Sequence, residues 1–471
     1  MMVSDNVYAS IGRLWKGDAL EALKNFVRLP AKSSDFEPDW ESKGILKKAL
    51  EDAAAWAKKQ VPGIRTEIFE EKGVPPALFW RLPATTGRRG RTAFFYGHLD
   101  KQPELEGWSE GLSPWNPVIR GDLLYGRGAV DDGYNFYAVM SAVKALEENG
   151  VPHPEIAGLY ETDEESGSKG LEAWIAEAAK RMGKPAFIAI NDLDGQDPSR
   201  LWLTLSTRGV LAFTLTAKVL ERPAHSGSAG GIVPSSFRIV RALLSRIEDE
   251  ETGEILVPEL RTEVPESILA AVRALSGKED VRAHFEWAGK THSEADTPYE
   301  AMLRNTWQSA LSITAAAGLP PLSSASNLVR AYTSVRVSIR MPPNADGRKA
   351  FEHIRTLLTE NVPCGAEVSI TDADMYNGFA QQPPEGWIKD ALSAASRRHF
   401  GGSEPGYLFC GASIGTLPNF RRQFPDSPFV NTGALSPSSH AHAPDENLSL
   451  SLCEKLACTA ADLIAAVPEE E

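Results

Sequence analysis

Short apolar runs that alternate with helix-patterned segments constrain the fold of this chain most. Between residue 91 and about residue 205, the runs RTAFFYG, EIAGLY and AFIAI are separated by two segments with apolar residues at helical spacing. This strand–helix–strand–helix–strand order predicts a parallel sheet with helices on its faces. Polar residues that follow the carboxyl ends of such strands meet at one edge of the sheet, and three polar clusters fall there: GHLD, TDEESGS and ND.

A change of pattern near residue 205 indicates a second domain. The stretch LWLTLSTRGVLAFTLTAKV alternates apolar and polar residues, which is typical of a half-buried antiparallel strand. A helix is expected over residues 235–247, and a strand–helix–strand unit follows residue 330 in YTSVRVSIRM, residues 348–360 and AEVSITDA. This order predicts a small α+β domain, interrupted over residues 250–325 by an insertion with helical pieces.

The first pattern returns after about residue 377. Helices are expected over residues 385–398 and 448–466, and YLFCGAS and PFVNTGA are expected to be strands between them. We therefore predict a discontinuous first domain of residues 1–205 and 377–471, with residues 206–376 inserted as the second domain.

Composition and charge exclude several classes of protein. The 471 residues are 42% hydrophobic and 24% charged, as in ordinary globular proteins, and no apolar run of about 18 residues predicts a membrane span. The formal charge of −14, from 63 acidic and 49 basic residues, disfavours nucleic acid and anionic membranes as partners and suits a metal cation. Four sparse cysteines without a CxxC pair, and an N-terminus without a signal-peptide pattern, predict a cytoplasmic protein.

Candidate metal ligands begin with the GHLD cluster. His98 and Asp100 lie two residues apart, so on a strand they share one side, where the aspartate can accept one ring N–H while the other nitrogen binds a metal. A histidine satisfied within a loop is the alternative for this pair alone. Asp131 and Asp132 follow a glycine-rich turn at an expected helix start, where helix capping is the alternative role.

Acidic residues gather at the next two strand ends. Asp163, Glu164 and Glu165 are consecutive, and such a concentration of like charge is costly unless a cation neutralises it or water solvates it. Asp192 follows the next strand, and His442 stands in SSHAHAPDEN before the last helix. Two imidazoles and three carboxylates from one sheet edge suit two zinc ions that share a bridging carboxylate. This set comprises His98, Asp131, Glu165, Asp192 and His442.

A series of ordered motifs makes the chain resemble a known family. The motifs are GHLDKQP, GWSEGLSPWNPVIRGDLLYGRGAVDDG, TDEESGS, AHSGSAGG, SIRMPPNAD, CGASIG and HAPDEN, and they cover nearly the whole chain. Their order resembles that of the M20 family of dinuclear zinc peptidases and deacylases, most of all the cytosolic dipeptidase and carnosinase branch. The resemblance implies an α/β fold: a zinc-binding catalytic domain, with a mixed and mostly parallel sheet flanked by helices, and an inserted α+β lid and dimerisation domain.

The resemblance also implies two zinc ions per subunit, with Mn²⁺ or Co²⁺ as alternatives. The first zinc is expected at His98, Asp131 and Asp192, and the second at Asp131, Glu165 and His442. Asp131 would then bridge the two ions, and its peptide bond to Asp132 is expected to be cis. Asp100 would orient His98, and Glu164 would act as the general base toward a zinc-activated water.

The resemblance implies four further site residues. His225 in AHSGSAGG matches a histidine that reaches the active site of the partner subunit and stabilises the oxyanion. Arg340 and Ser413 match positions that hold the free carboxylate of the substrate, and a strand arginine paired with a surface acid is the alternative for Arg340. Asn327 matches a lid position that contacts the reacting centre.

The chain departs from the family pattern at two places. Gly133 and Tyr134 stand where the dipeptidase branch usually has a lysine and a glycine after the two aspartates. HAHAPDEN holds two histidines, and the spacing to Glu446 favours His442 as the ligand while His440 remains the alternative.

The function expected from these residues is metal-dependent hydrolysis of the amide bond in dipeptides or short peptides with a free C-terminal carboxylate. An N-acyl-amino-acid deacylase that cleaves acetyl or succinyl groups is the alternative, and a catalytically silent ligand-binding dimer is a remote one. The expected partners are the small substrate and a second copy of the chain, which would form a homodimer through the lid domain.

Overall fold

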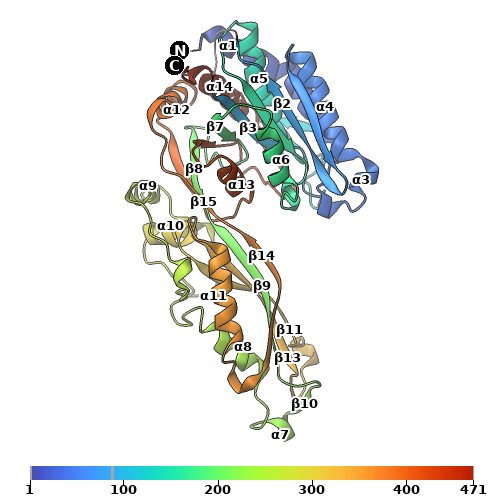
Figure 1. Cartoon of the computed structure of the whole chain (residues 1–471), viewed down its shortest axis with the longest axis vertical. Helices are drawn as coiled ribbons and strands as arrows, with labels where there is room; N and C mark the ends of the chain where they lie inside the picture. The colour runs from blue at the N-terminus through green and yellow to red at the C-terminus, as the bar shows by residue number, and fades with distance from the viewer. Residues whose placement is uncertain (1–2, 86–89, 470–471) are drawn as a thin grey trace. The chain divides into compact units, whose positions relative to one another are not determined.

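The computed structural model describes residues 3–85 and 90–469, and the chain forms two compact units (Figure 1). The first unit contains residues 1–204, 383–408 and 419–471, and the second contains residues 205–382 and 409–418. The segment 409–418 thus groups with the second unit, whereas the predicted first domain included it. No helix in the described ranges is long and apolar enough to cross a membrane.

A six-stranded sheet forms the centre of the first unit, in the order β1-β2-β6-β3-β7-β17. Its strands are β1 (Arg65–Glu71), β2 (Val74–Leu82), β3 (Thr92–His98), β6 (Ile156–Glu161), β7 (Pro185–Ile190) and β17 (Phe429–Asn431). β6, β3, β7 and β17 run parallel to one another, whereas β2 is antiparallel to both β1 and β6. Every residue of β3, β6 and β7 is buried, as expected for parallel strands covered on both faces.

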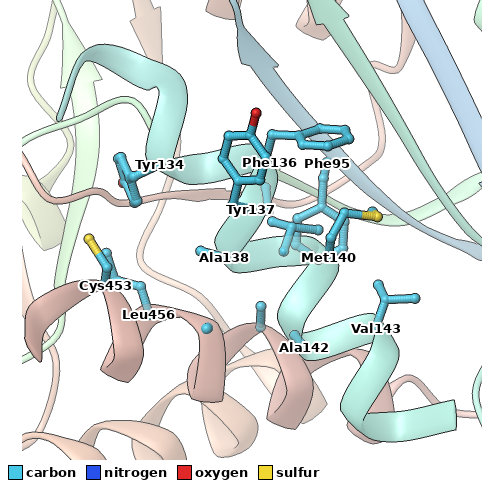
Figure 2. Close-up of a cluster of buried hydrophobic side chains, with 14 of the residues drawn as sticks. Phe95, Tyr134, Phe136, Tyr137, Ala138, Met140, Ala142, Val143, Cys453 and Leu456 are labelled. Atoms are coloured by element: carbon cyan, nitrogen blue, oxygen red, sulfur yellow. The ribbon is translucent and has the colours of Figure 1, made fainter. Parts of the chain in front are cut away.

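Helices flank this sheet and complete the hydrophobic core of the unit. They are α1 (Asp5–Leu14), α2 (Leu20–Arg28), α3 (Trp40–Lys43), α4 (Ile45–Gln60), α5 (Tyr134–Glu148), α6 (Leu171–Ala179), α12 (Gly386–His399), α13 (Thr416–Gln423) and α14 (Leu450–Ala466). α5 is buried along almost its whole length, and Figure 2 shows its side chains facing Phe95 of β3 and Cys453 and Leu456 of α14. The N-terminal and C-terminal segments of this unit therefore pack into a single hydrophobic core. Short strands β4 (Val118–Arg120), β5 (Leu123–Tyr125) and β18 (Asn447–Ser449) form a separate ribbon.

The second unit is built on a four-stranded antiparallel sheet in the order β11-β13-β9-β14. Its strands are β9 (Gly209–Lys218), β11 (Ala310–Ala317), β13 (Tyr332–Met341) and β14 (Glu367–Tyr376). Alternate residues of β9 and β13 are buried, and α8 (Ser236–Leu244) and α11 (Gly347–Thr359) pack on that face. Smaller elements of this unit are β10 (Ala224–His225), α7 (Ser226–Ala229), α9 (Glu266–Ser276), α10 (Pro298–Trp307), β12 (Leu328–Val329) and β15 (Phe379–Ala380). Two more short strands, β8 (Trp202–Thr207) and β16 (Gly406–Cys410), begin in the first unit and end in the second.

These two architectures confirm the predicted fold class, with two local differences. The alternating stretch near residue 205 is two strands, β8 and β9, because the chain leaves strand geometry at Arg208. The segment predicted as an insertion with helical pieces contains α9 and α10 but also the sheet strand β11.

A buried ion pair fastens the segment before β18 to the glycine-rich turn before α5. Arg127 and Glu446 are 1% and 0% exposed, and Arg127 Nη1 lies 2.7 Å from Glu446 Oε2. The other carboxylate oxygen of Glu446 accepts the Val130 N–H at 3.2 Å, and Arg127 also donates to the carbonyl of Ala443. Because both charges are removed from water, each depends on the other for compensation.

Glu446→Gln should therefore lower the free energy of unfolding by about 3 kcal/mol or more, because it leaves the buried guanidinium without a counter-charge. The matched control is Asp52→Asn, which removes the Lys48–Asp52 pair, whose side chains are 58% and 59% exposed. That control should cost less than about 1 kcal/mol. Denaturant titration of both variants measures the difference, and equal losses would contradict the structural role of the buried pair.

Candidate metal centre

The predicted ligands come from the ends of strands in the central sheet and from two nearby loops. His98 is the last residue of β3, Glu164 and Glu165 lie in a short 3-10 turn directly after β6, and Asp192 stands two residues after β7. Since β3, β6 and β7 are parallel neighbours, their carboxyl ends lie along one edge. Asp131 lies in the helical turn Ala129–Gly133, which leads directly into α5.

The structure brings these side chains together in two adjoining groups. One group is His98, Glu164 and Asp192, and the other is Asp131, Glu165 and His442; within each group the potential ligand atoms lie within 4.8 Å of one another. Asp131 contacts both histidines, with Oδ1 3.1 Å from His98 Nε2 and Oδ2 2.9 Å from His442 Nε2. One carboxylate with an oxygen directed at each imidazole has the geometry of a bridging ligand.

Asp100 joins the two strand ends behind these groups. Its carboxylate is fully buried, and its Oδ1 lies 3.2 Å from His98 Nδ1. The same carboxylate accepts the backbone N–H groups of Glu164 at 3.2 Å and Glu165 at 3.0 Å. Asp100 thus lies beside the imidazole and accepts hydrogen bonds from the backbone of the acidic turn. The peptide bond between Asp131 and Asp132 is cis.

The carboxylates of the two groups raise one another's pKa values. Burial and the neighbouring Asp131 raise the pKa of Glu165 to about 7 and the pKa of Asp192 to about 6. Burial, Asp192 and Glu165 raise the pKa of Glu164 well above its usual range. Contacts with Asp131 and Glu165 raise the pKa of His442 to about 11. A cation among these groups would offset the repulsion between the carboxylates.

The donor set itself fits divalent cations. His98 Nε2 lies 3.1 Å from Asp131 Oδ1 and 3.6 Å from Asp192 Oδ2, so one ring nitrogen faces two carboxylates. His442 Nε2 does the same, at 2.9 Å from Asp131 and 3.0 Å from Glu165. A single N–H group points in one direction and can donate well to only one of two carboxylates, whereas a cation can be coordinated by the ring nitrogen and both carboxylates together. Imidazole and carboxylate ligands are a suitable set for zinc, and manganese and cobalt accept the same donors.

Of the two histidines near the C-terminus, His442 is the one that contacts this cluster. Its backbone has a φ of 59°, in the left-handed region, and the loop that carries it is held by the Arg127–Glu446 pair. His440 is exposed and belongs to neither group.

Sequence reasoning missed one neighbour of the cluster. Gln102 donates from Nε2 to Oε2 of Glu165 at 2.6 Å, on the same oxygen that His442 approaches. Gln102 belongs to the motif GHLDKQP, and its position in that motif was the available sequence signal. Because its side chain carries no charge, the sequence did not predict that it contacts Glu165.

In the second unit, Arg340 and Ser413 lie together. Arg340 Nη1 donates to Ser413 Oγ at 3.0 Å, and no carboxylate in the described ranges pairs with this guanidinium. The nearby Arg208 is 7% exposed, donates to the carbonyls of Gly411, Arg304 and Gln308, and likewise has no acidic partner in the described chain. Burial and the charge of Arg340 lower the pKa of Arg208 to about 10. Two guanidinium groups without a counter-charge favour an anion at this place.

His225 and Asn327 are also neighbours within the second unit. β10 and β12 pair with His225 opposite Leu328, and the Ser226 N–H donates to the Asn327 carbonyl at 2.9 Å. The His225 side chain is exposed, and its Nδ1 accepts the Gly227 N–H at 3.2 Å. Because Nδ1 is an acceptor, a neutral His225 carries its proton on Nε2, which is then a hydrogen-bond donor directed away from the backbone.

Comparison with known proteins places the chain among metallopeptidases. The model of peptidase family M20/M25/M40 matches residues 94–466. The Cys-Gly metallodipeptidase dug1 of Schizosaccharomyces pombe is 27% identical over 439 residues, covering 89% of each chain. The human Beta-Ala-His dipeptidase is 32% identical over 194 residues, which is 41% of this chain and 38% of that protein.

Solved structures show the same fold. The M20 family metallo-carboxypeptidase Sso-CP2 from Sulfolobus solfataricus has a TM-score of 0.76 at 21% identity, over 96% of this chain and 99% of that one. The family match spans most of the chain, from β3 through α14. The protein is thus an enzyme with peptidase or amidohydrolase activity, and it belongs to peptidase family M20/M25/M40.

Proposed function

We propose that this enzyme hydrolyses dipeptides or short peptides with a free C-terminal carboxylate, at a centre that holds two divalent cations. The observation that carries the proposal is the position of Asp131, whose two oxygens face the two imidazoles of adjoining ligand groups. The ligands of one cation would be His98, Asp131 and Asp192, and those of the other would be Asp131, Glu165 and His442. Zinc is the proposed cation.

The bound cations would polarise the scissile carbonyl and lower the pKa of an attacking water to near neutrality. Glu164 lies in one group with His98 and Asp192. Because Asp131 also faces His98, Asp131 can serve as the third ligand there and leave Glu164 free to act as the base. It would take the proton of the attacking water and deliver it to the leaving amine. Arg340 and Ser413 would hold the terminal carboxylate of the substrate, which supplies the counter-charge that Arg340 otherwise lacks.

The relatives support dipeptides as substrates. One is named as a Cys-Gly metallodipeptidase and another as a Beta-Ala-His dipeptidase. Both names describe a peptide bond followed by a single C-terminal residue, which fits recognition of a nearby carboxylate.

The proposed location is the cytoplasm. Cys453 and Cys458 are buried thiols, and the reducing cytoplasm keeps such groups reduced.

A substrate panel tests this function directly. The purified enzyme with added zinc should cleave Cys-Gly and β-Ala-His, whereas N-acetyl and N-succinyl amino acids should react slowly or not at all. Removal of the cations with a chelator should abolish hydrolysis, and zinc or manganese should restore it. Faster cleavage of the acyl amino acids would favour the deacylase, and activity in a preparation free of transition metals would contradict the proposal.

Glu164 and Glu165 provide a matched pair for testing the role of the base. Glu164→Gln should retain both cations and lose roughly 10²- to 10⁴-fold in kcat, because only the proton carrier is removed. Glu165→Gln should instead weaken cation binding, since it removes a charged ligand. Metal analysis and kinetics of the two variants separate these roles. If Glu164→Gln loses a cation, Glu164 is a ligand and not the base.

We also propose that His225 acts in the partner subunit of a homodimer formed by the second unit. β11 is an edge strand of its sheet with exposed small residues, and an edge strand can pair with another chain. Two large apolar side chains on this unit, Ile232 and Leu322, are 82% and 95% exposed, as is common at contact surfaces. The donor on His225 Nε2 would stabilise the oxyanion that forms as the carbonyl is attacked.

Mixed dimers test the exchange of His225. His225→Ala alone should lower kcat by roughly 10²- to 10³-fold, as expected for loss of one oxyanion donor, without changing metal content. A dimer of one His225→Ala chain and one Glu164→Gln chain contains one site in which both residues are intact, so mixing should restore activity. Each variant mixed with itself is the control. No recovery after verified subunit exchange would show that His225 does not act across the interface.

A further inference from the structure

The first turn of α5 forms a buried polar network directly behind the proposed ligands. Asp132, Tyr134 and Asn135 are almost completely buried, although each carries a polar group. Asn135 Nδ2 donates to the Tyr96 carbonyl and to Asp132 Oδ2, both at 2.9 Å, and Asp132 Oδ2 also accepts the His98 N–H at 3.3 Å. The start of α5 is therefore tied to the end of β3, which carries His98.

The hydroxyl of Tyr134 ties the same turn to the end of β7. It donates to the backbone carbonyl of Asn191 and accepts the backbone N–H of Ala434 at 3.0 Å. Asn191 immediately precedes Asp192, and Asp192 forms a β-bridge with Gly433, which immediately precedes Ala434. The hydroxyl thus stands between the two backbone segments that hold Asp192.

The surroundings leave the network little freedom to rearrange. Asn191 Nδ2 donates to Asn135 Oδ1 at 2.9 Å, so the two asparagines fix each other. A Cβ atom at Gly97 would lie 2.4 Å from Asn135 Nδ2 and 2.5 Å from Asp132 Oδ2, which leaves no space for another side chain there. At Gly433 a Cβ atom would lie 2.1 Å from the Leu193 carbonyl oxygen, so the segment facing Asp192 is equally crowded.

We propose that Tyr134 is a positioning residue for the cation held by His98 and Asp192. Its hydroxyl fixes the peptide group before Asp192, and thereby the direction of that carboxylate toward His98, whose Nε2 lies 3.6 Å away. Without the hydroxyl, the Asn191 carbonyl and the Ala434 N–H lose their common partner in a buried site, and Asp192 loses its fixed backbone. The proposal rests on the proposed function, because it requires that the cations bind.

Two tyrosines on α5 make a matched comparison. Tyr134 and Tyr137, both labelled in Figure 2, are 1% and 3% exposed. Within residues 3–85 and 90–469, no hydrogen-bond partner is found for the Tyr137 hydroxyl. Tyr134→Phe and Tyr137→Phe therefore remove the same atom from the same helix, but only the first removes a contact with the backbone beside Asp192.

Zinc titrations in competition with a chromophoric chelator test the proposal on the whole enzyme. The parent enzyme is measured first, and a parent that binds no zinc would contradict the proposed function itself. Given two bound ions, Tyr134→Phe should bind one of them roughly 10- to 100-fold more weakly, as is typical when an outer partner of a ligand is lost. Tyr137→Phe should bind both ions like the parent. Excess zinc should restore the turnover of Tyr134→Phe.

The outcomes separate positioning from a general loss of stability. Thermal unfolding of the zinc-free variants shows whether each chain folds, and the titrations then show whether the two ions are affected differently. Equal weakening of both ions in Tyr134→Phe, or a Tyr134→Phe affinity equal to that of Tyr137→Phe, would overturn the proposal. If Tyr134→Phe does not fold without zinc while Tyr137→Phe does, Tyr134 stabilises the fold as a whole and the proposal is likewise overturned.

Discussion

The contacts of the buried Asp100 carboxylate are those on which the candidate ligand cluster depends. The carboxylate faces His98 Nδ1 and accepts the N–H groups of Glu164 and Glu165, so it fixes one strand end relative to the next. Both ligand groups contain a residue that Asp100 holds directly, since His98 and Glu164 belong to one and Glu165 to the other. A backbone N–H has a fixed direction, and for this reason the acidic turn cannot move without breaking these hydrogen bonds.

The parts of the fold that the sequence predicts are those with a strong hydrophobic period. β3, β6 and β7 are continuous buried runs, and β9 and β13 alternate buried and partly exposed residues, so both patterns can be read directly. β11 could not be predicted in the same way. Its residues are small and mostly exposed, because it is an edge strand, and such a strand has no buried face to impose a period.

The candidate site likewise contains residues that the sequence predicts and residues that it does not. The rule that polar residues gather at the carboxyl ends of parallel strands located His98, Glu165 and Asp192, because it requires only the order of the elements. Gln102 and Tyr134 could not be assigned from the sequence, since the contact of each depends on a residue far along the chain. Such contacts follow from the packing of α5 and the acidic turn, and a local pattern does not encode them.

The insertion of the second unit sets the order in which the protein can fold during its synthesis. All four strands of the antiparallel sheet have been synthesised by residue 376, before β17 and α14 of the first unit exist. Until β17 is made, β7 is an open edge with unpaired backbone groups, and α5 lacks the helix that covers it. His442 is made after β17 and before α14. The second unit can therefore complete its sheet on the nascent chain before the C-terminal segment of the first unit is made. The first unit is then the part that needs protection from aggregation.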